Sequence, residues 1–235
     1  MNLILVRHGQ ARFGTDDYDR LSSLGREQMQ RLADHLCQLA DQPRQLVHGT
    51  LRRQRESAEL LCQAFDRKGA SLRARSDPRL NEYDIAGVFW GYLDDVIAAQ
   101  PELAPYRNHL NDNPEVFETV YRGVMQAWLA DGRPESRGLQ SWADFQSRIR
   151  DAVSALETKL PSDDQVLLMT SGAVVASLAG QALELDAQGI LALNRELHNS
   201  SMTRLRLTDG QMTLTMFNAV PHLETADAER LLSKR

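Results

Sequence analysis

The sequence predicts an α/β protein with a mostly parallel sheet and an antiparallel pair at one edge. Short apolar runs, such as residues 3–6 and 166–169, are typical of buried strands. They alternate with longer segments in which apolar residues recur every three or four positions, as in amphipathic helices. Near the end of the chain, Asp209-Gly210 separates two strand-like segments and is a strong hairpin signal. The alternation predicts parallel strands, and the hairpin supplies the antiparallel edge.

The remaining elements follow the same two patterns in chain order. A first helix is predicted after Ser22 or Ser23, because either hydroxyl can cap its N-terminus and apolar residues then recur at helical spacing. Further strands are predicted at residues 45–48, 72–76, 202–207 and 212–217. Further helices are predicted around residues 58–65, 116–129, 142–160 and 173–183.

Length and composition fit one large domain that carries an insertion. The chain has 235 residues, of which 42% are hydrophobic, and this is enough to bury a sizeable core. Residues 89–138 contain four prolines and short helical patterns, so we expect a helical insertion that caps the site of a single domain at 1–225. The last residues, 226–235, are polar and are expected to form a frayed tail.

Charge and cysteine usage exclude several other classes of protein. The net charge of −5 argues against a general nucleic-acid binder, which is usually basic. The apolar run near the N-terminus is too short for a signal sequence or a membrane span. Cys37 and Cys62 lack metal-ligand spacing and are expected to be buried, reduced thiols. We therefore expect a cytoplasmic protein that binds neither nucleic acid nor membrane.

Arg7, His8 and Gly9 directly follow the first predicted strand, where α/β proteins place ligands. A neutral imidazole is a nucleophile and is well populated near pH 7. The guanidinium of Arg7 can hold phosphate oxygens in a planar fork, and Gly9 lets the backbone approach closely. The tripeptide suggests phosphoryl transfer to His8, and the simpler alternative is a hydrogen-bonded structural histidine.

Residues 5–10 (LVRHGQ) resemble the signature of the histidine phosphatase superfamily, which also includes the cofactor-dependent phosphoglycerate mutases. Further segments resemble this family in the same order along nearly the whole chain, at residues 21–28, 51–58, 80–91, 166–172 and 217–223. The resemblance implies the phosphoglycerate mutase-like fold, a three-layer α/β/α sandwich.

The resemblance also implies chemical roles for the matched residues. His8 would become the phosphohistidine, while Arg7 and Arg53 would hold the phosphoryl oxygens. Glu82 would protonate the leaving oxygen and then help to deprotonate the attacking water, with Asp84 as a rival acid. No metal or organic cofactor is implied, and the expected ligand is a small phosphorylated substrate or inorganic phosphate.

The chain departs from the family at the end of the strand predicted at residues 166–169. The family has His-Gly there, whereas this chain has Ser171-Gly172. A serine hydroxyl is shorter than an imidazole and cannot carry a positive charge. Losing one charged donor costs roughly 3–4 kcal/mol, or about 10²–10³ in rate.

Several groups are candidates to replace the missing histidine. Ser171 itself can bind phosphate, or a neighbouring donor can compensate, such as Thr170 or the N–H groups of Gly172 and Ala173 at a helix start. His198 and His222 are displaced-histidine candidates, although structural roles are favoured for both. The expected substrate-binding residues are Arg7, Gly9, Gln10, Arg53, Ser171 and Gly172.

The favoured function is a phosphatase that hydrolyses a small phosphomonoester through a phosphohistidine on His8. The alternative is a weak or inactive phospho-ligand binding protein on the same fold, and a phosphoglycerate mutase ranks lower. Substrate specificity is expected to come from residues 89–138 and from the loop 12–19. Arg12, Arg107 and Arg122 can meet an anionic substrate, but solvated surface charges are the favoured interpretation.

Overall fold

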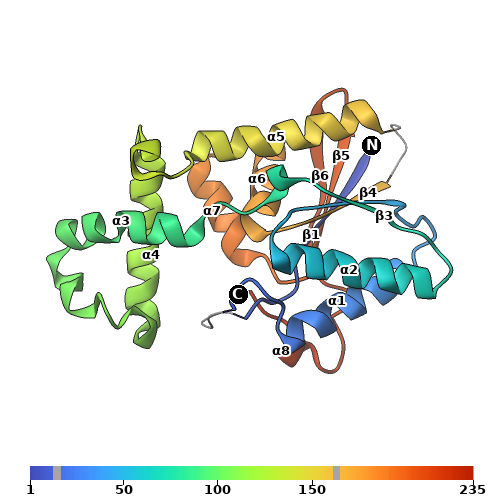
Figure 1. Ribbon diagram of the computed structural model, residues 1–235, viewed down its shortest axis with the longest axis horizontal. Helices are drawn as coiled ribbons and strands as arrows, with labels where there is room; N and C mark the ends of the chain where they lie inside the picture. The colour runs from blue at the N-terminus through green and yellow to red at the C-terminus, as the bar shows by residue number, and fades with distance from the viewer. Residues whose placement is uncertain (13–16, 161–164, 235) are drawn as a thin grey trace. The chain divides into compact units, whose positions relative to one another are not determined.

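The core of the protein is a six-stranded sheet in the order β3-β2-β4-β1-β5-β6 (Figure 1). The computed structural model describes residues 1–12, 17–160 and 165–234. β1 and β4, β4 and β2, and β2 and β3 pair in parallel, whereas β5 and β6 are antiparallel. The predicted sheet is therefore confirmed, with strands β1 (Asn2–Arg7), β2 (Gln45–His48), β3 (Arg73–Ser76), β4 (Gln165–Thr170), β5 (Met202–Thr208) and β6 (Gln211–Ala219).

The turn between β5 and β6 forms where the sequence predicts it. Asp209 and Gly210 both have positive φ, 51° and 76°. A two-residue turn with positive φ at both positions matches the right-handed twist of the strands that it joins. The antiparallel edge thus follows directly from this dipeptide.

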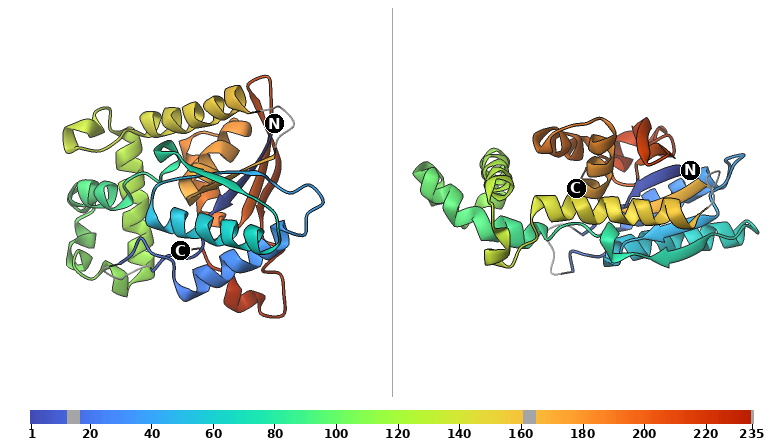
Figure 2. Two further views of the ribbon diagram at one scale, coloured as in Figure 1. Left: turned by 45° about the vertical axis from the view of Figure 1, so that its right-hand side comes forward. Right: turned by 90° about the horizontal axis from the view of Figure 1, so that it is seen from above.

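Both faces of the sheet are covered by helices. Ile4 and Val6 on β1 pack with buried residues of α1 (Ser23–Leu36) and α2 (Arg52–Arg67). Leu3 and Leu5 point to the other face and are also fully buried. Seen from above, α6 (Gly172–Ala182) and α7 (Ala187–Glu196) lie across the strands from α1 and α2 (Figure 2). Burial of both faces explains why the central strands are continuous apolar runs in the sequence.

The helix boundaries follow identifiable caps. The Ser22 hydroxyl accepts from Gly25 N at 3.0 Å, which confirms the predicted cap of α1. α7 is not among the helices predicted from the sequence, although Asp186 caps it by accepting from Gly189 N at 2.8 Å. The two cysteines are free thiols but only half-buried, not fully buried as expected. None of the described helices is long and apolar enough to cross a membrane.

The described chain divides into two compact units, one made of residues 1–82 and 148–235 and the other of residues 83–147. The second unit includes residues 89–138, where the sequence predicts a helical insertion, and it contains α3 (Ile85–Ala99), α4 (Pro114–Ala130) and the start of α5 (Trp142–Lys159). Within it, the Tyr83 ring lies 4.7 Å from that of Trp128 and 5.5 Å from that of Phe145. This unit has an aromatic core of its own, and its role as a cap stays a prediction.

The C-terminal segment is packed, which corrects the expectation of a frayed tail. A short helix, α8 (Ala228–Leu231), ends in the fully buried Leu231. Asn199 N donates to Ser233 O at 2.8 Å, and the Ser233 hydroxyl donates to Asn199 Oδ1 at 2.9 Å. The buried Leu231 and the partly buried Leu232 hold this segment among polar residues, and an average over composition does not detect them.

Candidate functional site

The strand pairing brings the predicted site residues together at the carboxyl edge of the parallel strands. Arg7 lies opposite Thr170 in the β1–β4 register, and His8 N donates to Thr170 O at 2.8 Å. One residue beyond the ends of β1 and β4, His8 and Ser171 lie side by side. This edge is where open parallel sheets place their ligands.

Hydrogen bonds determine which nitrogen of His8 is nucleophilic. Nδ1 lies 2.7 Å from Gly9 O, and a carbonyl oxygen can only accept, so Nδ1 carries the hydrogen. Nε2 therefore keeps its lone pair, and this lone pair accepts from Arg53 Nε at 3.0 Å. The imidazole is thus held at both nitrogens, with the hydrogen on Nδ1 and the lone pair on Nε2.

Arg53 is positioned by the first turn of α2. Its buried guanidinium also donates to Asp19 Oδ1 at 2.5 Å, and Asp19 Oδ2 accepts from Arg52 N at 2.7 Å. Asp19 thus binds both the start of α2 and the Arg53 side chain. One more hydroxyl connects α2 to β1, because Ser57 accepts from Gly9 N at 3.2 Å and donates to Arg53 O at 2.8 Å.

The surroundings of His8 favour its neutral form. Burial lowers the pKa of His8 well below 6.5, and the positive charges of Arg53 and Arg7 lower it further. A neutral imidazole at neutral pH keeps Nε2 unprotonated, so that it can accept from Arg53 Nε. The guanidinium groups of Arg53 and Arg7 beside the neutral ring supply charged N–H donors of the kind that bind an anion.

We expect Arg53→Met to raise the pKa of His8 while leaving it below 6.5, because the charge disappears but burial, the larger cause, remains. NMR titration of the His8 ring measures this change. Arg52→Met is the matched control, since the Arg52 guanidinium binds Glu56 and Asp17 instead of His8. An unchanged or lower pKa of His8 in Arg53→Met would contradict the electrostatic explanation.

Arg7 has one donor without a partner. Its terminal nitrogens donate to Leu197 O and, at 3.1 Å, to Lys234 O, whereas Nε is buried without a hydrogen bond. Burial lowers the pKa of Arg7 to about 10, so the group stays charged at neutral pH. An unpaired buried donor on a charged group needs an explanation, and a bound anion supplies one.

Glu82 lies at the N-terminus of α6. Its Oε2 accepts from Ala173 N at 3.1 Å, and its charge acts on the buried Arg7. The segment just before Glu82 is anchored by Arg148, which donates to Arg79 O at 2.6 Å and Asn81 O at 3.0 Å. The rival acid, Asp84, caps α3 by accepting from Gly87 N at 2.8 Å.

The other predicted binding residues divide into two groups. Ser171 and Gly172 lie at the turn beside Arg7, where a Cβ on Gly172 would come within 2.5 Å of Asn194 Oδ1 and 3.5 Å of Arg7 Nε. Gly9 packs closely on α1, since a Cβ there would meet Gly25 O at 2.4 Å. The Gln10 side chain instead accepts from the Ser22 hydroxyl at 2.8 Å, which ties it to the α1 cap.

The displaced-histidine candidates both make structural contacts. His198 Nδ1 lies 3.3 Å from Asn218 Nδ2, and His222 Nε2 lies 2.8 Å from the Ser200 hydroxyl. Ser200 N donates to His8 O at 3.2 Å, so His222 supports the backbone behind His8. Burial lowers the pKa of His222 to about 3.

The buried His222 predicts a loss of stability in acid. Its folded-state pKa lies below the unfolded value of about 6.5, so the unfolded chain binds the extra proton between these values. Its contribution to the free energy of unfolding falls as pH drops, by about 1.4 kcal/mol per pH unit. Urea titrations from pH 7 to 4 should show a shallower pH dependence for His222→Asn. Parallel curves for wild type and variant would contradict this prediction.

Sequence reasoning missed the residues that support the site, including Asp19, Gln54 and Arg148. Their only signal is contact across distant parts of the chain.

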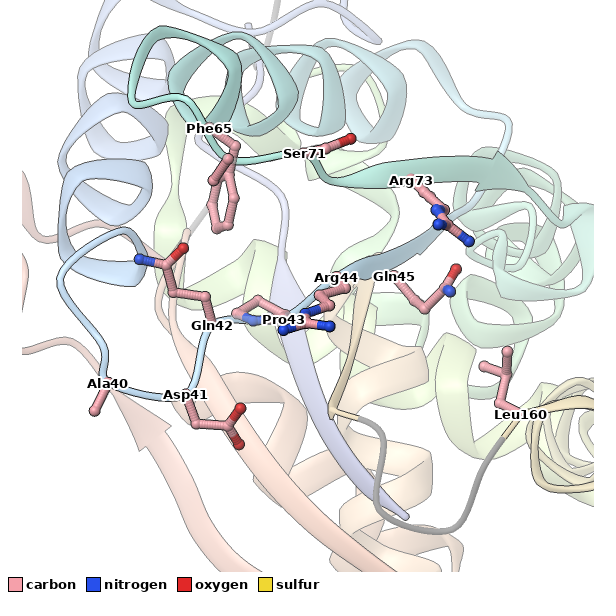
Figure 3. A pocket seen from close by; sticks show the side chains of 11 residues that line it. Ala40, Asp41, Gln42, Pro43, Arg44, Gln45, Phe65, Ser71, Arg73 and Leu160 are labelled. Carbon is pink, nitrogen blue, oxygen red and sulfur yellow. The ribbon is translucent and has the colours of Figure 1, made fainter.

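Of the arginines considered for substrate contact, Arg107 pairs with Asp94 at 2.8 Å. Part of the loop expected to set specificity, residues 13–16, lies outside the described residues. A cavity of about 780 Å³ beside Arg44 and Arg73 lies at the opposite edge of the sheet, and no predicted site residue lines it (Figure 3).

An imidazole lone pair beside two guanidinium groups is suited to attack on phosphorus, which points to α/β proteins that handle phosphoryl groups. The family comparison agrees, since the profile of the histidine phosphatase superfamily (branch 1) matches residues 3–220. The chain therefore belongs to the histidine phosphatase superfamily. No curated protein matches it.

Solved structures with similar folds cover almost the whole chain. The native mycobacterial glucosyl-3-phosphoglycerate phosphatase is 26% identical over 93% of this chain and 98% of its own, with a TM-score of 0.61. Its complex with inorganic phosphate is 25% identical over 94% and 98%, with a TM-score of 0.62. YhfR from Bacillus stearothermophilus, 20% identical over 95% and 99% with a TM-score of 0.62, shares the fold.

Proposed function

We propose that this protein is a phosphatase that hydrolyses a small phosphomonoester through a phosphohistidine on His8. The observation that carries the proposal is the His8 ring, whose Nδ1–H is bound to Gly9 O and whose Nε2 lone pair is held beside Arg53 Nε. A fixed, neutral nucleophile beside two guanidinium groups is what attack on a phosphate ester requires.

In the first step, the Nε2 lone pair forms a bond to phosphorus as the bond from phosphorus to the ester oxygen breaks. The ring becomes positively charged, and Gly9 O stabilises it by accepting from Nδ1–H. Arg53 Nε, which donates to Nε2 in the free protein, gives up this hydrogen bond as the lone pair attacks and donates to a phosphoryl oxygen instead, as the unpaired Arg7 Nε also does. Glu82 gives its proton to the leaving oxygen.

In the second step, the Glu82 carboxylate takes a proton from a water molecule whose oxygen attacks phosphorus. The bond from phosphorus to Nε2 breaks, and the neutral imidazole and inorganic phosphate are released. Glu82 is protonated again and ready for the next ester. Ala173 N–H, which donates to Glu82 Oε2, holds the carboxyl group through both steps.

A phospho-ligand binding protein is the second candidate function, and Ser171 is the observation that favours it. Ser171 stands where the resemblance implies a histidine, so one charged donor to the transition state is missing. Anion binding by Arg7 and Arg53 does not depend on that donor. A phosphoglycerate mutase ranks lower, because a mutase must retain a bisphosphorylated intermediate and a weakened phosphate site opposes retention.

The test is hydrolysis of para-nitrophenyl phosphate and a panel of phosphometabolites that includes glucosyl-3-phosphoglycerate. Rapid quenching with radiolabelled substrate should trap an alkali-stable, acid-labile label on His8. Turnover together with this label supports the phosphatase. Anion binding without turnover or label on every substrate would favour the binding protein instead.

A further inference from the structure

Ser171 is a helix-capping serine whose hydroxyl does not cap its helix. It is the N-cap residue of α6 and is 1% exposed, yet its side chain accepts no hydrogen bond from the helix backbone. Serine is a preferred N-cap because its oxygen normally accepts from the second or third helical N–H. Here the second helical N–H, that of Ala173, donates to Glu82. The carboxylate of Glu82 thus takes over the cap and releases the Ser171 hydroxyl.

Gln54 holds this hydroxyl in a defined direction. Its Nε2 donates to Ser171 Oγ at 2.8 Å and to Leu80 O at 3.2 Å, while its Oε1 accepts from Leu51 N at 3.3 Å. The Oε1 contact fixes which end of the amide faces Ser171. An amide nitrogen has two hydrogens and accepts none, so the Ser171 hydroxyl receives a hydrogen bond and must direct its own hydrogen elsewhere.

The β1–β4 register places Ser171 next to His8 and Arg7. Ser171 follows Thr170, which lies opposite Arg7 and accepts from His8 N. The unpaired Nε of Arg7 lies beside Gly172, the next residue. The Ser171 hydroxyl and Arg7 Nε are therefore two donors at adjacent positions, next to the nucleophile.

We propose that Gln54 and Ser171 act as a unit in place of the second histidine, with Gln54 orienting the Ser171 hydroxyl to donate to a phosphoryl oxygen. The catalytic role of this Gln54–Ser171 pair rests on the proposed phosphatase function. Ser171 contacts the phosphoryl group, whereas Gln54 is a positioning residue that acts through Ser171. No proton leaves the hydroxyl, so this donor contributes a neutral hydrogen bond throughout.

The same pair explains why a histidine does not fit at position 171 in this chain. Gln54 is fully buried, and its amide occupies the space directly beyond Ser171 Oγ. An imidazole at position 171 extends into that space. Ser171→His is expected to lower both stability and anion affinity, whereas Gln54→Ala combined with Ser171→His should recover affinity because it makes room for the ring.

The principal experiment measures dissociation constants of vanadate and inorganic phosphate for wild type, Ser171→Ala, Gln54→Met and the double variant. Vanadate adopts the five-coordinate geometry of phosphoryl transfer, so it reports on donors that act in the transition state. Ser171→Ala should weaken vanadate binding about tenfold to a hundredfold, with a smaller effect on phosphate. Gln54→Met preserves the packing volume and should produce a similar loss, and the double variant should lose no more than Ser171→Ala.

A control variant and thermal unfolding separate this role from general damage. Ser177→Ala removes another fully buried serine of α6 and should leave vanadate affinity within about twofold. Leu80 O keeps a donor in Gln54→Met, because the Thr170 hydroxyl donates to it at 2.6 Å. The proposal would be overturned if the double variant lost vanadate affinity by the product of the two single losses, or if Ser171→Ala left vanadate affinity unchanged.

The binding measurements do not require turnover, so the two proposals fail separately. Vanadate affinity that depends jointly on Ser171 and Gln54, in a protein that hydrolyses nothing, would remove the phosphatase and retain the donor pair. If the protein turned over substrate through His8 but its vanadate affinity did not change in either variant, the phosphatase would be supported and the donor pair would be overturned. A protein that binds neither anion overturns both.

Discussion

Replacing His8 with asparagine should reduce phosphomonoester turnover by about 10⁴-fold or more and abolish phosphoryl labelling of the protein. The variant loses the atom that bonds to phosphorus, and the covalent route disappears with it. An asparagine side chain can still hydrogen-bond in the space that the imidazole occupied, so the fold should persist. Steady-state kinetics with quench-flow labelling measure both effects.

His48 provides a matched control for this variant. It ends β2 as His8 follows β1, and its Nδ1 contacts Gly49 O at 2.8 Å in the same local arrangement. His48→Asn should retain most activity and all of the labelling. If His48→Asn lost the label while His8→Asn kept it, the nucleophile would be assigned to the wrong strand end.

Glu82→Gln should lower kcat/KM, which reports phosphoryl transfer to His8, by about 10²–10⁴-fold for alkyl phosphates and much less for para-nitrophenyl phosphate. Nitrophenolate leaves readily without a proton, whereas an alkoxide needs one. The glutamine amide oxygen can still accept from Ala173 N–H, so the local geometry should remain. The ratio of kcat/KM for the two kinds of leaving group is the measurement.

Asp84→Asn is the control for Glu82→Gln. Asp84 caps α3, and asparagine is an equally good cap, so this variant should be stable and active on both substrates. Equal losses on both leaving groups in Glu82→Gln would show that Glu82 is not the acid. A loss confined to alkyl phosphates in Asp84→Asn would transfer that role to Asp84.

The fold was predictable because its signals are local. Short apolar runs indicate the buried strands, the Ser22 cap marks the start of α1, and Asp209-Gly210 is a hairpin turn by its own backbone preferences. The position of His8 followed as well, since a residue directly after a central parallel strand lies at the ligand-binding edge. Errors occurred where local polarity misled, at α7 and in the C-terminal segment, which is held in place by the buried Leu231.

The sequence by itself determined the α/β class, the family resemblance and the types of residue available for phosphoryl chemistry. Only the tertiary structure decided which atoms meet: the tautomer of His8 depends on Gly9 O and Arg53, and the Ser171 hydroxyl accepts from Gln54, 117 residues away. Backbone propensities act over a few neighbouring residues, so they select elements. Hydrogen bonds between side chains far apart in the chain exist only after the sheet has aligned the ends of its strands.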